Sequence, residues 1–310
     1  MHDRGDVKRL LVPVMFLLSV GCAREDPATD RVEPKEPRIV VMAPAAAEVL
    51  EILGMTDRVV GRGDFVAWPP AMQGLPKVGA YHAPSVETVL SLKTTLLLTT
   101  ASQAAQGAHL KLRELGIEVL ALETNTYESM LASIVSIGRE VDREGEANRV
   151  VREIRREIDE IRELARDAPP RRVVFVVDRD PVYVAGPGSH VDEMIRAVGG
   201  ENIAADAASD WQLLSMEIIF ERAPEVIVDT SDNRDGALRG RVAGPWDRWP
   251  FLPAVERDRV YWVDPIRLVI PGPRLPQMTR LMGRLIHPEI FGEPSPEDFE
   301  ALQGVDDAPR

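Results

Sequence analysis

The side chains that most often carry catalysis or bind metals are scattered along this chain. Beyond the N-terminal region the histidines are His82, His109, His190 and His287, and none of them belongs to a His-Glu-x-x-His pattern. A zinc site needs three or four converging ligands, and covalent catalysis needs a nucleophile beside a base. Neither arrangement is indicated by these positions, so we expect neither an enzyme nor a metal site.

Two polar segments in the second half match chemical motifs only in part. Asp178 and Asp180 precede a proline, which is typical of a solvated turn. Residues 186–189, with the sequence GPGS, lack the third glycine of a dinucleotide-binding fingerprint. Ser189 is better interpreted as the N-terminal cap of a helix.

The overall composition excludes one large class of partner. The chain has 310 residues, which fits one large or two medium domains, and its formal net charge is −13. Phosphate binding requires a basic face, so we expect no nucleic-acid partner. Cys22 is the single cysteine, and no internal disulfide can form.

The N-terminus has the pattern of an exported lipoprotein. Two basic residues precede a short apolar run at positions 10–20, which is typical of a signal peptide and too short for an ordinary transmembrane helix. Residues 18–22, LSVGC, resemble the bacterial lipobox, although Leu18 lies one position early. We therefore expect a signal peptide at 1–21, a lipid anchor on Cys22 at the outer side of the membrane, and a flexible tether at 22–37.

One long amphipathic segment, Glu146–Arg166, separates two similar regions. Its apolar residues recur at three- and four-residue steps on an otherwise charged rod, which predicts a helix of roughly 30 Å. The stripe consists of Ala147, Val150, Val151, Ile154, Ile158, Ile161 and Leu164. The pattern fits either a connector between two lobes or a surface helix of one domain. We divide the chain into lobes at 38–141 and 169–292, a connecting helix at 142–168 and a disordered tail at 293–310.

Strands and helices alternate in both regions, which favours α/β lobes with parallel sheets flanked by helices. Apolar runs predict strands at 39–42, 59–61, 96–98, 119–122, 172–177, 182–185, 225–228 and 260–263. Helices are expected at 46–53, 86–92, 110–115, 126–140, 189–198, 216–222 and 275–286. Trp211 is expected in a loop.

From residue 38 to about 291, the chain resembles the substrate-binding proteins of iron-chelate and vitamin B12 ABC transporters. The matching segments include DFVAWPP, LPKVGAYHAPSVETVLSLK, VGGENIA, SMEIIFERAPEVIV and PGPR, in the family's order and spacing. The resemblance implies two α/β lobes joined by one rigid helix, with a ligand held in the cleft between them.

The resemblance also implies which side chains hold the ligand. In this family, aromatic side chains from both lobes grip a large flat ligand while a few polar groups orient it. The matching positions here are Phe65, Tyr81, Tyr183, Trp211, Arg267 and Arg274. Phe65 and Tyr183 could instead close the lobe cores, and Arg274 could form an ion pair with a carboxylate of a lobe.

The resemblance leaves several ligands open, of which we favour a cobalamin-like corrinoid. Tyr81 or His82 could bind haem iron, but neighbours on an extended loop point to opposite sides. A ferric siderophore would use basic residues such as Arg267 and Arg274. A lipoprotein that senses its ligand without transporting it would have the same fold.

Two glutamates match the family's docking residues, one in each lobe. Glu87 and Glu217 each open a helix, where a carboxylate suits the positive helix end. The resemblance implies that both meet arginines on a membrane permease. We expect a monomer that delivers its ligand to a permease dimer.

Overall fold

The computed structural model describes residues 36–298, except 81, 106, 232–239 and 242–243. Residues from Glu36 onward form one compact unit, which we describe as a first lobe up to Val141, a connecting helix and a second lobe from Pro169. None of the helices in the described part of the chain is long and apolar enough to cross a membrane.

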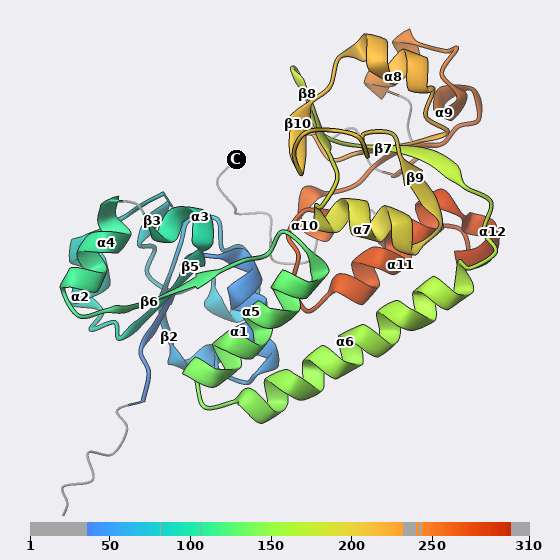
Figure 1. The fold of residues 1–310 in the computed structure, drawn as a ribbon. Coiled ribbons are helices and arrows are strands. Elements are labelled where there is room, and N and C mark those ends of the chain that lie inside the picture. Colours follow the sequence, from blue (N-terminus) through green and yellow to red (C-terminus); the bar gives the residue numbers. More distant parts are fainter. Residues whose placement is uncertain (1–35, 81, 106, 232–239, 242–243, 299–310) are drawn as a thin grey trace, which may run out of the picture. The chain divides into compact units, whose positions relative to one another are not determined.

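The first lobe is built on a four-stranded parallel sheet with the order β2-β1-β5-β6 (Figure 1). Its strands are β1 Ile39–Val41, β2 Val59–Arg62, β5 Leu96–Thr100 and β6 Glu118–Leu122, with a small hairpin of β3 Gly79–Ala80 and β4 Ala83–Pro84. Its helices are α1 Pro44–Ile52, α2 Val86–Ser91, α3 Ala101–Ala104, α4 Gly107–Glu114 and α5 Tyr127–Glu140, with 3-10 turns at Thr56–Arg58 and Pro70–Met72.

Both faces of this sheet are covered, as the continuous apolar runs predicted. Ile39 and Val41 of β1 pack with the residues of α1 and α5, whereas Val40 and Met42 pack with those of α2 and α4. Successive side chains of a strand point to opposite faces, so an apolar residue at every position is needed to fill both layers.

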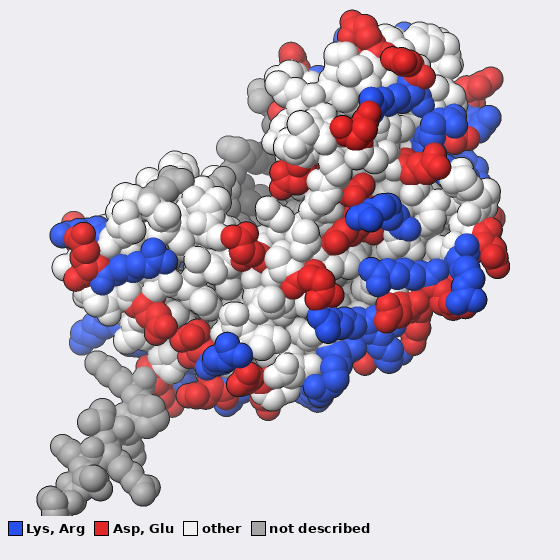
Figure 2. Space-filling view, in the orientation of Figure 1, with Lys and Arg blue, Asp and Glu red and all other residues white. Residues whose placement is uncertain are grey.

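The connecting helix α6, Glu144–Leu164, confirms the predicted periodic helix with its ends shifted by two residues toward the N-terminus. Between Ala147 and Ile161 the predicted stripe is buried except at Val150, which is half-buried, and Leu164 at its end is 54% exposed. The stripe packs against α5 of the first lobe and against α11, Leu275–Ile286, of the second. Acidic and basic side chains are interspersed along the outer face (Figure 2). On this face Arg156 pairs with Glu153 and Glu160.

The second lobe contains a larger, mixed sheet with the order β10-β8-β7-β11-β13-β12, and β9 pairs with β7. Its strands are β7 Arg171–Arg179, β8 Val182–Ala185, β9 Gly200–Asn202, β10 Trp211–Leu213, β11 Val226–Asp229, β12 Gly240–Arg241 and β13 Val260–Trp262. Its helices are α7 His190–Ala197, α8 Met216–Arg222, α9 Pro253–Glu256, α10 Pro265–Leu268, α11 and α12 Pro288–Phe291, with 3-10 turns at Gly244–Arg248 and Pro296–Asp298.

The parallel part of this sheet is β9-β7-β11-β13. The pairs β7-β8, β8-β10 and β12-β13 are antiparallel. The predicted central parallel sheet is therefore confirmed in both lobes, and the second lobe adds antiparallel strands at its edges. Val173 and Phe175 of β7 pack with α7 and α11, and Val174 and Val176 pack with α8 and α9 on the other face.

Three local predictions differ from the structure. Trp211 was expected in a loop but begins the edge strand β10. Asp178 was expected in a turn but lies inside β7, which forms a hairpin with β8. The disordered tail was predicted to begin at residue 293, but residues 293–298 are ordered against the second lobe. Asp298 there accepts two hydrogen bonds of 2.9 Å from Arg284 of α11. Residues 299–310 of the predicted tail lie outside the described residues.

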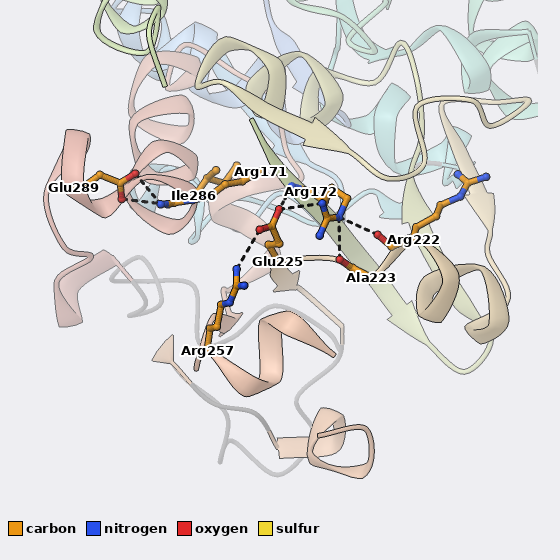
Figure 3. Close-up of polar contacts among 8 residues, drawn as sticks. All are labelled: Arg171, Arg172, Arg222, Ala223, Glu225, Arg257, Ile286 and Glu289. Carbon is orange, nitrogen blue, oxygen red and sulfur yellow. Dashed lines mark hydrogen bonds and ion pairs between the residues drawn. The ribbon is translucent and has the colours of Figure 1, made fainter. Parts of the chain in front are cut away.

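A polar network fastens the start of β7 where the chain leaves the connecting helix (Figure 3). Arg171 binds the carboxylate of Glu289 at 2.9 Å and the Ile286 carbonyl at the end of α11. Glu225 accepts a bond of 3.2 Å from the Arg172 backbone and one of 3.1 Å from Arg257. These contacts tie β7 to α11 on one side and to β11 on the other.

Candidate ligand-binding site

The loop that follows β2 in the first lobe is held in place by a buried arginine. Arg62 ends β2 and donates hydrogen bonds to the carbonyls of Val66 at 3.0 Å and Gln73 at 3.1 Å. Burial lowers the pKa of the Arg62 guanidinium, while Asp64 raises it. Phe65, at the start of this loop, is 43% exposed, so it does not close the core of the lobe.

Helix α1 connects this loop to a segment of the second lobe. Trp68 forms a side-chain hydrogen bond with Glu51, and Glu48 lies one turn earlier on the same helix. Burial raises the pKa of Glu51, and the nearby Glu48 carboxylate raises it further. Arg274, from the PGPR segment, binds both carboxylate oxygens of Glu48 at 2.8 and 2.5 Å. The structure thus shows the ion pair that sequence analysis kept as an alternative for Arg274, and ligand contact by this residue stays a prediction.

In the second lobe, the two predicted aromatic residues lie on one face of the sheet. In the β8-β10 pair, Trp211 lies opposite Ala185 and Leu213 lies opposite Tyr183. Opposite residues of an antiparallel pair share a face, as do alternate residues along a strand. Tyr183, Trp211 and Leu213 are therefore neighbours on the same face, at the edge of the sheet. Trp211 and Tyr183 are both half-buried, and Leu213 is 62% exposed.

His190 contacts the ring of Trp211 and also connects to α10. Its ring centroid lies 5.9 Å from that of Trp211, with the planes tilted by 55°. Its Nε2 atom lies 3.1 Å from the carbonyl oxygen of Leu268, the last residue of α10. Burial lowers the pKa of His190 to about 4, while the hydrogen bond to Leu268 raises it. The ring is therefore neutral at pH 7 and donates from Nε2.

We expect this buried histidine to make the protein less stable as the pH falls below 6.5. The unfolded state takes up the proton near pH 6.5, whereas the folded state resists it down to about pH 4. The stabilisation from neutral His190 is complete above pH 6.5 and is lost toward pH 4. The free energy of unfolding should therefore fall by about 2 kcal/mol between pH 7 and pH 5 because of this residue. Urea unfolding at pH 7 and pH 5 measures this change in stability. In His190→Gln the change between the two pH values should be smaller by most of this amount. An unchanged pH dependence in His190→Gln would contradict the assignment.

The two predicted docking acids occupy equivalent positions on their helices. Ser85 caps α2 by accepting from the Thr88 amide at 3.2 Å, and Ser215 caps α8 by accepting from the Ile218 amide at 3.4 Å. Glu87 and Glu217 each follow their cap by two residues, in the first turn of the helix, and both are exposed. The backbone amide of Glu217 and the Ser215 hydroxyl lower the pKa of the Glu217 carboxyl, which keeps it ionised.

Comparison with known proteins identifies the family. The family model described as periplasmic binding protein matches residues 39–266, which is most of the chain. The chain belongs to the periplasmic binding proteins. As in other members, the sequence and fold are those of a substrate-binding component of an ABC transporter.

Individual relatives resemble this binding protein over most of its length. An uncharacterized ABC transporter substrate-binding lipoprotein, YvrC of Bacillus subtilis, is 30% identical over 94% of this chain and 92% of its own. A vitamin B12-binding protein of Vibrio cholerae is 24% identical over 76% of this chain and 84% of its own. The crystal structure of the periplasmic heme-binding protein HutB of Vibrio cholerae superposes with a TM-score of 0.73 at 23% identity, covering 82% of this chain and all of HutB.

Several predicted site residues of this binding protein stay predictions. Tyr81 lies outside the described residues, between strands β3 and β4, and Cys22 lies outside them near the N-terminus. Arg267 belongs to α10, but its side chain is outside the described part. His82 is exposed.

Two pockets in the described part of the chain have linings that do not include these residues. One of about 450 Å³ lies beside the connecting helix and includes Tyr127, whose hydroxyl bonds to Thr279 of α11 at 2.6 Å. The backbone amide of Tyr127 donates to Glu193 of α7 at 2.5 Å. These contacts fasten α5 of the first lobe to the second lobe, on the side of α6.

Sequence reasoning missed three residues that position the site. Arg62 fixes the FVAWPP loop, His190 supports Trp211, and Glu48 holds Arg274. Only Glu48 had a sequence signal, because a single carboxylate inside the apolar run 45–50 must find a partner when that helix is buried.

Proposed function

We propose that this protein captures a cobalamin-like corrinoid and hands it to a membrane permease. The observation that carries the proposal is the shared face of Tyr183 and Trp211 at the edge of the second sheet. Two aromatic side chains on adjacent paired strands offer a rigid, flat, apolar surface, which suits a large planar ring system. The vitamin B12-binding relative supports this choice of ligand.

Haem is the second candidate. The similarity to the fold of the heme-binding protein HutB supports it, as does the presence of Tyr81, whose phenolate is a suitable ligand for ferric haem. A haem protein of this kind would need Tyr81 for iron ligation, whereas a corrinoid would need it only for stacking.

A direct titration distinguishes these ligands. The purified protein is mixed with cyanocobalamin, haemin or a panel of ferric siderophores, and binding is followed by tryptophan fluorescence and calorimetry. One-to-one binding of cyanocobalamin at submicromolar concentration would support the proposal. A tyrosinate-type haemin spectrum that disappears in Tyr81→Ala would replace the corrinoid by haem. If none of these ligands bound, a sensor without transport would gain support.

We also propose that Glu87 and Glu217 dock the protein on the permease, and that Cys22 carries a lipid anchor on the outer side of the membrane. The matched Ser-x-Glu caps of α2 and α8 support the docking role, because each places a carboxylate at an exposed helix end in its own lobe. The relative named as a lipoprotein supports the anchor.

Removing both acids should separate docking from ligand capture. Glu87→Ala with Glu217→Ala is expected to leave the ligand affinity unchanged and to weaken permease binding at least tenfold, since two charge-assisted contacts are lost. Calorimetry measures the first quantity, and ligand uptake by whole cells reports the second. Loss of ligand binding in the double variant would refute the docking assignment.

A further inference from the structure

A row of aromatic side chains runs from the core of the second lobe to its surface beside α8. The ring of the buried Trp246 lies 5.6 Å from that of Trp249, and Trp249 lies 5.7 Å from Phe220 of α8. Phe220 lies 5.2 Å from Phe251, which meets it edge to face and is 63% exposed. Only 5% of the residues in this chain are aromatic, so this concentration of rings at one place on the surface needs a reason.

The backbone around Phe251, the outermost ring of the row, is well anchored although the Phe251 side chain is exposed. Leu252, the next residue, is fully buried, and its amide donates to the Trp249 carbonyl at 3.0 Å. The Ala254 amide then donates to the Pro224 carbonyl at 3.0 Å. Prolines at 250 and 253 flank the segment and restrict its backbone. An aromatic side chain that is already fixed loses little conformational entropy when a partner covers it.

The helix that carries Phe220 is equally well anchored, and it also carries Glu217. Ser215 caps its N-terminus, and at its other end Arg172 Nε donates to the carbonyls of Arg222 and Ala223 at 3.1 Å (Figure 3). Glu217 and Phe220 are three residues apart, so they lie on the same side of α8. An ionised carboxylate and a rigid aromatic surface are therefore neighbours.

We infer that Phe220, Trp249 and Phe251 form an apolar docking surface that the membrane permease covers when Glu217 binds it. This inference rests on the proposed docking role of Glu217. The matching surface of the permease should carry an apolar depression beside a basic side chain. In such an interface, a central aromatic anchor supplies affinity, and the flanking ion pair supplies orientation.

Charge disfavours the other occupants of this surface. A second copy joined through the same patch would bring Glu217 near its own symmetry mate, and each copy carries a net charge of −13. An anionic lipid surface would be repelled for the same reason. A permease with basic groups at this place meets the acid and the aromatic rings together.

Site-specific crosslinking in cells tests the inference. The photoreactive p-benzoylphenylalanine is introduced in turn at Phe251 and at Glu221, which is exposed on α8 one turn after Glu217, so that the docking acid itself is kept. The matched control is Leu164, which is 54% exposed at the end of α6. Crosslinked products are identified by mass spectrometry. We expect the probes at Phe251 and Glu221 to label the same ABC permease and the probe at Leu164 not to label it.

The outcomes separate the two proposals. Permease labelling from Glu221 but not from Phe251 would overturn the inference and leave the proposed docking intact. No permease labelling from either position would refute the proposed docking itself. Labelling of a second copy of this chain, or of lipid alone, from Phe251 would assign the patch to that occupant and overturn the inference.

A binding measurement with the permease identified in this way completes the test. The permease complex is reconstituted in nanodiscs and titrated with the protein. Phe251→Ser should weaken binding at least tenfold while ligand affinity stays unchanged, and Leu164→Ser should change neither. Equal permease affinities for Phe251→Ser and the unsubstituted protein would overturn the inference.

Discussion

Substituting Arg274 by Met is expected to reduce the free energy of unfolding by about 3 kcal/mol. Arg274 forms an ion pair with Glu48, which is 5% exposed. Both carboxylate oxygens of Glu48 accept hydrogen bonds from the Arg274 guanidinium. Removing the arginine leaves a buried negative charge without compensation, which costs more than the ion pair itself contributes. Urea unfolding at pH 7 measures the change.

A double variant provides the control for this prediction. Glu48→Leu combined with Arg274→Met replaces the charged pair by apolar side chains and should restore stability to within about 1 kcal/mol of the original protein. A loss below about 1 kcal/mol in Arg274→Met alone would show that water or another group compensates Glu48, and the ion pair would then be dispensable.

Replacing Trp211 by Ala should weaken binding of the ligand by roughly 30-fold, or about 2 kcal/mol. Trp211 supplies the largest ring of the aromatic surface on the second sheet, and its half-buried position means that the ring is presented in one orientation. Calorimetric titration with the ligand established by the cobalamin, haemin and siderophore experiments measures the loss.

The conservative variant distinguishes stacking from a structural effect. Trp211→Phe keeps a flat ring over His190 and should lose less than about fivefold in affinity. Trp211→Phe should also unfold at a urea concentration close to that of the original protein, whereas Trp211→Ala loses its packing on the core and should unfold at a lower one. If Trp211→Ala bound the ligand as well as the original protein, the ligand would lie elsewhere, and the proposed aromatic surface would be wrong.

Much of the architecture is local and could be predicted from the sequence. The 3.6-residue stripe of α6 and the apolar runs of β1, β5, β7 and β11 specify their secondary structure wherever they pack. Helix α11 begins and ends at the predicted residues, Leu275 and Ile286, because Pro273 and Pro276 mark its start and Pro288 follows its end. The family resemblance then ordered these elements into two lobes.

The site itself depends on contacts between residues far apart in the sequence. Glu48 and Arg274 are separated by 226 positions, and no local pattern pairs them. The sequence predicts a loop at Trp211 because only three residues of β10 pair with β8. That is too few for a period-two pattern to appear. The exposed Phe251 likewise acquires its aromatic neighbours only when α8 packs beside it. Secondary structure follows from short-range periodicity, whereas the meeting of single side chains depends on how finished helices and strands pack, and this was decided by the tertiary structure alone.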